Sequence, residues 1–236
     1  MRNEEVLMPI INKFYNKINN KEFVIDKTGC KIVELICENI ALDPDPILNF
    51  NIKKTNEDYC KHELDWYNSQ DLNVKEIARC AKLWNSVCDK QGNVNSNYGW
   101  CIYSDANYNQ YINCRNELIQ NKETRRAVMI YNRPSMWKDF NNDGMNDFIC
   151  TFDTQCFIRD NKLCYIVNMR SCDFIFGFFN DFFWHCNVYN KLYQELIQFG
   201  YKDLQIGKII WIANSLHVYE RHFEMIKKIV EASENG

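Results

Sequence analysis

The hydrophobic patterns of this 236-residue chain predict an α+β fold. Three observations support the prediction. Apolar residues recur every fourth position near the start of the chain, which is the spacing of an amphipathic helix. Two strand-type runs enclose a short polar turn at residues 159–162. Strand-type and helix-type runs are mixed without the regular alternation that builds parallel βαβ units.

The first part of the chain is expected to contain two helices and one long strand. The four-residue apolar spacing predicts a helix over residues 4–19. Residues 26–29 have the composition of a turn, and residues 31–42 that of a strand. A second helix is expected over residues 57–69, with another helical turn or two within residues 71–80.

The second part is expected to contain four strands and three helices. A helix over residues 105–120 is predicted to begin with Asp105 as its N-cap. A short strand over residues 126–131 precedes the strand pair around the polar turn. Residues 174–199 are expected to be mostly helical, residues 206–213 to form a strand, and residues 218–232 to form the last helix.

Composition favours a single catalytic domain over residues 1–236 without a membrane or nucleic-acid partner. No linker, repeat or low-complexity tract interrupts the chain, and its length is typical of one domain with one core. The net charge of −3 argues against general affinity for nucleic acid, because that affinity depends on many Lys and Arg contacts to phosphate. The apolar runs fall short of the ~20 residues that span a bilayer.

Cysteine usage predicts a reducing compartment, and we therefore expect the protein in the cytoplasm. The twelve cysteines are scattered, contain no CxxC pair and follow no signal peptide. Eleven of them are expected to be small, buried hydrophobic residues, as free cysteine usually is. Cys150 is the exception discussed below.

No metal site is expected. The run that begins at Asp139 matches the first half of a calcium-binding loop, but the twelfth position, where such a loop needs a bidentate glutamate, is Cys150. The four histidines have no zinc-binding spacing with neighbouring cysteines.

Residues 146–184 carry the chemistry that organises the rest of the chain. Cys150 stands at the head of a strand-type run, and the chain returns along a second run to Arg170 and Ser171. A helix then follows that carries Asp181. One segment therefore offers a nucleophile, an anion-binding group and a carboxylate.

This order of residues resembles the thymidylate synthase superfamily. The resemblance extends, in order, through residues 26–29, 63–67, 95–100, 125–126, 133–136, 169–181 and 215–219. Each of these short motifs is weak alone, but together they cover nearly the whole chain. The resemblance implies the fold of that superfamily, which is a mixed β-sheet with flanking helices in a homodimer.

Within the superfamily, the chain is most similar to the branch that hydroxymethylates deoxycytidylate. Synthases read uracil with an asparagine at the position that matches Asp181, whereas hydroxymethylases carry an acid there. A protonated carboxyl can donate to N3 of cytosine and accept from its 4-amino group, so Asp181 is expected to select cytosine and assist catalysis. Thr151, where synthases usually have histidine, and a C-terminal tail (231–236) without an apolar ending favour the same branch.

The resemblance implies catalytic roles for three further residues. Hydroxymethylation at C5 needs a transient nucleophile at C6, and Cys150 is expected to supply it as a thiolate, with Arg170 lowering its pKa. Glu63 is expected to exchange protons and to position the water molecule that adds to the one-carbon unit. Its aromatic neighbours are expected to raise its pKa. Tyr98 is expected near the nucleophile and the C5 proton.

The phosphate of the substrate is expected to bind a cluster of cations that two subunits share. Lys27, Arg170 and Ser171 match the family residues that one subunit contributes, and Arg125 and Arg126 match the arginine pair that reaches across from the other. The resemblance therefore predicts an obligate homodimer with two shared sites, which agrees with the usual twofold symmetry of oligomers.

The remaining expected contacts concern the sugar and the cofactor. His217 and Tyr219 match the pair that hydrogen-bonds the sugar, with His217 expected at the opening of a helix. Asp173 matches a residue near the pyrimidine and the folate, and Trp66 is expected on the folate side. The one-carbon donor that the resemblance implies is 5,10-methylenetetrahydrofolate, since no side chain can supply the carbon.

The sequence thus predicts a cytoplasmic enzyme, in the host cytoplasm if viral, that converts dCMP to 5-hydroxymethyl-dCMP and tetrahydrofolate for modified viral DNA. The alternatives with the same fold are hydroxymethylation of CMP or dUMP, or thymidylate synthesis. A different alternative is a non-catalytic relative that binds a nucleotide or RNA. The joint presence of Cys150, Glu63 and Asp181 argues against this last alternative, because binding alone needs none of them.

Overall fold

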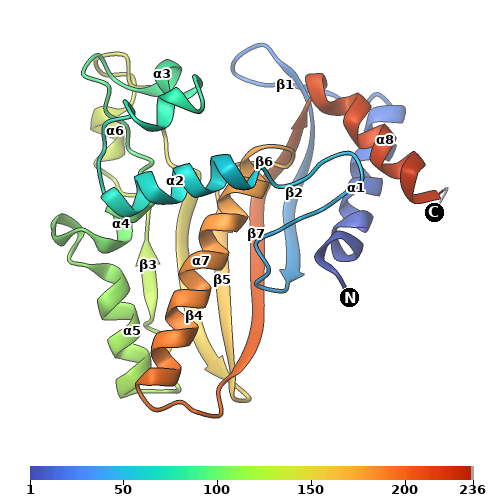
Figure 1. Cartoon of the computed structure of the whole chain (residues 1–236). Helices are drawn as coiled ribbons and strands as arrows, with labels where there is room; N and C mark the ends of the chain where they lie inside the picture. Colours follow the sequence, from blue (N-terminus) through green and yellow to red (C-terminus); the bar gives the residue numbers. More distant parts are fainter. Residues whose placement is uncertain (235–236) are drawn as a thin grey trace.

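A computed structural model describes residues 1–234 of the chain (Figure 1). Its first part contains α1 (Asn3–Asn19), β1 (Val24–Ile25), β2 (Lys31–Leu42) and α2 (Glu57–Ser69). The two helices and the long strand expected here are confirmed, with a difference of one residue at the start of α1. The side chain of Asn56 caps α2 by accepting a hydrogen bond of 3.2 Å from the backbone N–H of Tyr59.

The middle of the chain consists of short elements. They are η1 (Ile77–Arg79), α3 (Trp84–Val87), α4 (Tyr98–Tyr103), η2 (Asp105–Asn107), α5 (Gln110–Gln120), β3 (Val128–Ile130) and α6 (Met136–Asp139). The prediction that Asp105 caps α5 is wrong, because Tyr108 and Asn109 have positive φ angles of 60° and 41° and interrupt the helix. Asn109 is the cap instead, and its side chain accepts from the backbone N–H of Ile112.

The last part of the chain supplies most of the sheet and the central helix. It contains β4 (Thr151–Arg159), β5 (Lys162–Met169), β6 (Cys172–Asp173), α7 (Gly177–Gln198), β7 (Gln205–Tyr219), η3 (Glu220–His222) and α8 (Phe223–Glu234). The strand expected to end at residue 213 continues to Tyr219, since β7 pairs with β2 as far as Ile32. The last helix therefore begins at Phe223, and His217 lies in a strand rather than at the opening of a helix.

The strands form one mixed sheet in the order β1-β2-β7-β5-β4-β3, with β6 beside β7. β5 and β6 run parallel to β7, while the other neighbours are antiparallel. The expected hairpin joins β4 to β5 through Asp160 and Asn161, whose φ angles of 48° and 59° suit a tight hairpin turn. The mixed sheet with its helices confirms the α+β prediction.

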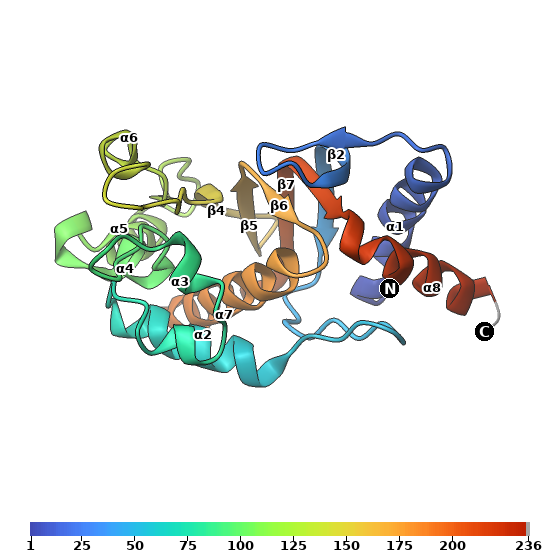
Figure 2. The ribbon, with the colours of Figure 1, turned by 90° about the horizontal axis from the view of Figure 1, so that it is seen from above.

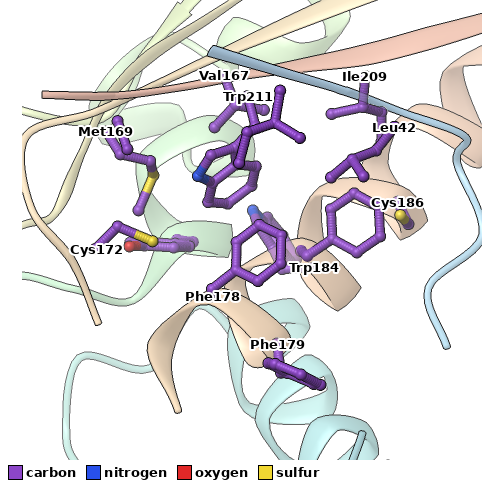
Figure 3. Packing of buried hydrophobic residues seen from close by; sticks show 14 of the residues in the cluster. Leu42, Val167, Met169, Cys172, Phe178, Phe179, Trp184, Cys186, Ile209 and Trp211 are labelled. Carbon is purple, nitrogen blue, oxygen red and sulfur yellow. The ribbon is translucent and has the colours of Figure 1, made fainter. Parts of the chain in front are cut away.

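Helix α7 lies along one face of the sheet, and α1 and α8 lie together beyond β2 (Figures 1 and 2). Alternate residues of β5 are buried, as expected for a strand with one face against the core. Figure 3 shows the packing between α7 and the sheet, where the rings of Phe178 and Trp211 meet edge to face at 5.1 Å. Within residues 1–234, no helix has the length and apolar character needed to cross a membrane.

The register of β4 and β5 determines where the chemistry collects. Thr151 pairs with Met169, so Cys150 and Arg170 meet at the same end of the hairpin. The backbone N–H of Arg170 donates to the carbonyl of Cys150 at 2.7 Å. The start of α7 follows a few residues later, which brings Asp181 to the same end of the sheet.

Candidate active site

A cavity of 490 Å³ opens at this end of the sheet, between α2, the segment around α3, and the start of α7. Eight of the expected site residues line it. They are Glu63, Tyr98, Cys150, Ser171, Asp173, Asp181, His217 and Tyr219. The fold therefore collects residues that lie as much as 156 positions apart in the sequence (63 to 219) around one space.

Cys150 is partly exposed to this cavity, and a guanidinium nitrogen of Arg170 lies 3.9 Å from its sulfur. Burial raises the pKa of the Cys150 thiol to about 12, and the negative charge of Asp181 adds to the increase, whereas Arg170 lowers it. Arg170 lowers the pKa of Cys150 as expected, but the net pKa of the thiol in the unliganded chain is raised. Arg170 acts in the expected direction, but desolvation is the larger effect.

Asp181 is a carboxyl group whose protonated form is favoured by its surroundings. Burial raises its pKa well above the usual range, the charge of Glu63 raises it further, and Tyr98 opposes the shift through a hydrogen bond. A protonated carboxyl can donate one hydrogen bond and accept another. Its neutral form also removes the negative charge that would oppose ionisation of Cys150.

Glu63 is 5% exposed and lies on the inner face of α2. Burial raises its pKa to about 7, while a hydrogen bond from the hydroxyl of Tyr59 lowers it. That bond joins Tyr59 Oη to Glu63 Oε1 at 2.6 Å. A carboxyl group with this pKa exchanges protons readily near neutral pH.

Tyr98 reaches the cavity because α4 packs unusually closely on α2. A Cβ atom on Gly99 would lie 1.8 Å from the carbonyl oxygen of Tyr67, so only glycine permits this approach. The rings of Tyr98 and Tyr67 stack at 5.1 Å as a result. Asn97 caps α4, since its side chain accepts from the N–H of Trp100 at 2.7 Å.

Asp147 connects the segment before β4, which contains Cys150, to the loop before α4. It is buried, lines the cavity and accepts hydrogen bonds of 2.7 Å from the backbone N–H groups of Asn95 and Ser96. The hydroxyl of Ser96 donates a third bond of 2.6 Å. These bonds hold the start of α4, and with it Tyr98, at a fixed position relative to Cys150.

The side of the cavity expected to bind sugar contains a chain of polar groups. The hydroxyl of Ser215 donates to Glu34 Oε1 at 2.5 Å, so its oxygen is left to accept from Nδ1 of His217 at 3.5 Å. Burial lowers the pKa of His217, which keeps the ring neutral. Its Nε2 is then an acceptor, and this atom can receive a hydrogen bond from a sugar hydroxyl. Tyr219 packs edge-on against the same ring at 5.1 Å.

Two of the expected phosphate-binding cations lie on one aromatic pair. The guanidinium of Arg170 lies 5.3 Å from the ring centre of Phe148, and the ammonium of Lys27 lies 5.3 Å from that of Phe140. The two rings meet edge to face at 5.5 Å. Neither cation is among the residues that line the cavity, whereas Ser171 is.

Arg125 and Arg126 are not brought to the cavity of their own chain. Both are exposed in the segment before β3. Arg126 is 78% exposed at its side chain and forms a surface ion pair of 3.1 Å with Glu117. Their expected role in the site of another subunit stays a prediction.

Trp66, expected on the folate side, lies behind the cavity wall. It is 5% exposed, and its indole donates to the carbonyl of Asn73 at 3.1 Å. Its ring packs edge-on at 4.9 Å against Trp84, which does line the cavity. The tryptophan in a position to touch a ligand is therefore Trp84, and Trp66 supports it.

The same wall is suited to a flat aromatic ligand. It combines Trp84 with Ala81, Leu83, Val87 and Phe176. Leu83 is 72% exposed and Phe176 51% exposed, so these apolar side chains present open faces. Asp173 lies beside this wall and carries an ion pair of 3.7 Å to Arg221. These residues fit the pterin ring of a folate, for which an apolar surface with one nearby carboxylate is appropriate.

Sequence reasoning missed Tyr59, Trp84 and Asp147. A signal existed for Tyr59, because it precedes Glu63 by four residues in a helix and such pairs lie on one face. Asp147 is three residues before the nucleophile, but nothing in the local pattern separates it from the polar turn around it. No group of three or more His, Cys, Asp or Glu side chains that could hold a metal ion occurs within residues 1–234.

Comparison with known proteins shows the family of this chain. A model of the thymidylate synthase family matches residues 11–235. The chain is 46% identical over 211 residues to the deoxycytidylate 5-hydroxymethyltransferase of Enterobacteria phage T4, which covers 89% of this chain and 84% of the phage protein. The protein of the same name from Enterobacteria phage T6 matches to the same extent. A thymidylate synthase of Buchnera aphidicola subsp. Schizaphis graminum is 24% identical over 229 residues, covering 94% of this chain and 81% of the relative. The chain belongs to the thymidylate synthase family.

Proposed function

We propose that this protein is a deoxycytidylate 5-hydroxymethyltransferase, which converts dCMP to 5-hydroxymethyl-dCMP. The observation that carries the proposal is the carboxyl of Asp181, which lines the same cavity as Cys150 and whose pKa is raised by burial, so that its protonated form is favoured. Cytosine needs a donor at N3 and an acceptor for its 4-amino group, and one neutral carboxyl supplies both. The relatives from phages T4 and T6 carry the same activity in their names.

Cys150 is the proposed nucleophile that adds to C6 of the cytosine ring. The thiolate forms 3.9 Å from the guanidinium of Arg170, and the raised pKa of Asp181 favours the neutral carboxyl that does not oppose its charge. As the carbon–sulfur bond forms, Asp181 donates its proton toward N3, which takes up the electrons displaced from the ring. C5 thereby becomes nucleophilic.

The later steps are assigned to Tyr98, Glu63 and the apolar wall. 5,10-Methylenetetrahydrofolate, held against Trp84 and beside Asp173, supplies the one-carbon unit at the oxidation level of formaldehyde. Tyr98 interacts electrostatically with Asp181 and Cys150 at the cavity, and the proton that leaves C5 is assigned to it. Glu63, with a pKa of about 7, takes a proton from the water that becomes the new hydroxyl group.

Substrate binding is proposed to use the sugar and phosphate sides of the cavity. His217 Nε2 and the Tyr219 hydroxyl bind the sugar, and Ser171, Arg170 and Lys27 bind the phosphate. Cations of this kind are the usual partners of a nucleotide phosphate.

A second subunit is proposed to complete the phosphate site with Arg125 and Arg126. The face of the sheet away from α7 supports a dimer, because it presents half-buried apolar residues of neighbouring strands. Phe157, Ile166, Ile210 and Ile212 are members of this face. A sheet face of this composition is suited to pack against a copy of itself.

The place of action is proposed to be the cytoplasm of the host cell, where the product would serve the synthesis of modified viral DNA. None of the twelve cysteines, all of which lie in the described part of the chain, forms a disulfide. Free thiols agree with a reducing compartment.

The test is to incubate the purified protein with 5,10-methylenetetrahydrofolate and with dCMP, CMP or dUMP, and to identify the products by mass spectrometry. Hydroxymethyl-dCMP with tetrahydrofolate is the expected result. A methylated nucleotide with dihydrofolate would identify a thymidylate synthase instead. Nucleotide binding without any product, and without exchange of the C5 proton, would identify a non-catalytic relative.

A further inference from the structure

Glu63 is held at the cavity by a chain of two hydrogen bonds from neighbouring aromatic side chains. The indole Nε1 of Trp84 donates to the hydroxyl oxygen of Tyr59 at 3.1 Å. The hydroxyl of Tyr59 donates in turn to Glu63 Oε1 at 2.6 Å. All three residues line the cavity.

The direction of these bonds follows from the chemistry of the groups. An indole nitrogen can only donate, so the oxygen of Tyr59 must accept from Trp84. The single proton of the Tyr59 hydroxyl is then directed to Oε1 of Glu63. With Oε1 engaged as an acceptor, a proton bound by Glu63 resides on Oε2, the other carboxyl oxygen.

We propose that Tyr59, braced by Trp84, is a positioning residue that reserves Oε2 of Glu63 for proton exchange with the substrate and its water. This inference rests on the proposed function, because that function assigns the proton transfers to Glu63. Tyr59 acts through Glu63 and performs no transfer itself.

The electrostatic surroundings of Glu63 make the hydrogen bond from Tyr59 the main influence that lowers the pKa of this carboxyl. Cys60 and Tyr67 on α2 and Asp181 on α7 are the other titratable groups that interact with it. Burial raises the pKa of each of the three, which favours their uncharged forms. Tyr59 is therefore the group that opposes the burial of the Glu63 carboxylate.

The bracing of Tyr59 extends beyond the cavity wall. Trp84 packs edge-on against Trp66 at 4.9 Å, and Trp66 is fixed by its hydrogen bond to the carbonyl of Asn73. A donor fixed in this way polarises the Tyr59 hydroxyl and strengthens its bond to Glu63. A ligand packed on Trp84 would thus lie next to the group that controls the proton of Glu63.

The experiment measures the pH dependence of kcat with dCMP for the wild type and four variants. Glu63→Gln identifies the limb of the profile that belongs to Glu63. Tyr59→Phe is expected to move that limb upward by roughly one pH unit, since the carboxylate loses a hydrogen bond that stabilises its charge. Trp84→Phe is expected to move it in the same direction by less.

The matched control is Tyr193→Phe. Tyr193 also loses a hydrogen bond, in this case 2.9 Å to the carbonyl of Leu204, but it lies outside the cavity lining. In Tyr193→Phe, the limb of the kcat profile that belongs to Glu63 is expected at the same pH as in the wild type. A change of KM for dCMP that stays below about twofold in Tyr59→Phe separates a shifted pKa from a damaged binding site.

A second readout does not depend on turnover. Infrared difference spectra between wild type and Glu63→Gln report the titration of the Glu63 carboxyl in the unliganded protein, and the same comparison in the Tyr59→Phe background reports its shift. A Glu63 pKa that is the same with and without the Tyr59 hydroxyl would overturn the inference. A wild-type protein that makes no hydroxymethylated product would overturn the proposed function instead, so the two failures are distinguishable.

Discussion

At the scale of single residues, the site is governed by burial rather than by ion pairs. The cavity contains a carboxyl with a pKa of about 7, a second carboxyl with a pKa well above the usual range, and a thiol with a pKa of about 12. In each of the three, desolvation is the largest cause of the shift. Burial favours the protonated form of Asp181, while Glu63, with a pKa of about 7, exchanges its proton near neutral pH.

Glu63 provides a pH-dependent prediction. Because its pKa is about 7 and the water step needs the carboxylate, turnover is expected to rise with pH through this value. Glu63→Gln should lose this rise together with a factor on the order of 10²–10⁴ in kcat. Steady-state assays from pH 5 to 9 measure both. A Glu63→Gln enzyme that keeps the wild-type limb would show that another group titrates there.

Cys150 provides a prediction about thiol reactivity. Its raised pKa leaves little thiolate at neutral pH in the free protein, so alkylation by iodoacetamide should be slower at Cys150 than at the exposed Cys37 and Cys80. Arg170→Ala should slow it further, because the guanidinium lowers this pKa. Peptide mass spectrometry after timed labelling gives the rates. Fastest labelling at Cys150 would contradict the dominance of desolvation.

At the scale of elements, the close packing of α4 on α2 determines where Tyr98 lies. Gly99→Ala places a methyl group 1.8 Å from the carbonyl oxygen of Tyr67, so the two helices must separate. We expect a loss of about 1–3 kcal/mol in the free energy of unfolding, together with reduced turnover as Tyr98 moves. Urea titration measures the stability.

Gly177→Ala is the control for that prediction. A Cβ at Gly177 would make only ordinary contacts of 3.6 Å and 3.7 Å with Asp173 and Asp181. The free energy of unfolding should therefore stay near that of the wild type. Equal losses in the two variants would mean that the contact with Tyr67 is not the cause.

Long elements with a clear period could be predicted from the sequence. Helix α2 has the expected bounds because its hydrophobic pattern extends over more than three turns. Strand β2 has them because its pattern extends over a long extended run. Elements that depend on distant partners could not be predicted. The far end of β7 is a strand because β2 lies beside it, and α4 is too short to display a period.

The candidate site was predictable to a similar degree. The order of the motifs predicted most of the residues that meet at the cavity. The burial of each side chain and its contacts with distant residues are properties of the folded chain. The net effect on Cys150 required the depth of the cavity as well as the presence of Arg170. That Trp84 rather than Trp66 lines the cavity wall depends on the relative orientation of the two rings, which the sequence does not show.

At the scale of the whole molecule, the proposed phosphate site requires two subunits. Arg125 and Arg126 stay outside the cavity of their own chain, and we assign them to the site of a partner. Mixing Cys150→Ala with Arg126→Ala should therefore restore activity, because each mixed dimer contains one site free of both substitutions. Random exchange predicts about a quarter of the wild-type rate.

Assays before and after subunit exchange measure this recovery. The matched control mixes Cys150→Ala with Glu63→Ala, since both residues line the cavity of the same chain and are expected to act in the same site. Each mixed dimer of this pair carries one substitution in each of its two sites, so the control should recover no activity. If the mixture of Cys150→Ala with Arg126→Ala regains no activity, the sites are not shared between subunits.

The most direct test of the central claim concerns Asp181 and the base that it reads. The measurement is the ratio of kcat/KM for dCMP to kcat/KM for dUMP, in the wild type and in Asp181→Asn. We predict that the wild type prefers dCMP and that the substitution shifts the ratio toward dUMP by at least about tenfold, because asparagine presents a donor to O4 and an acceptor to N3–H. A ratio that Asp181→Asn leaves unchanged would contradict the claim that this carboxyl selects cytosine.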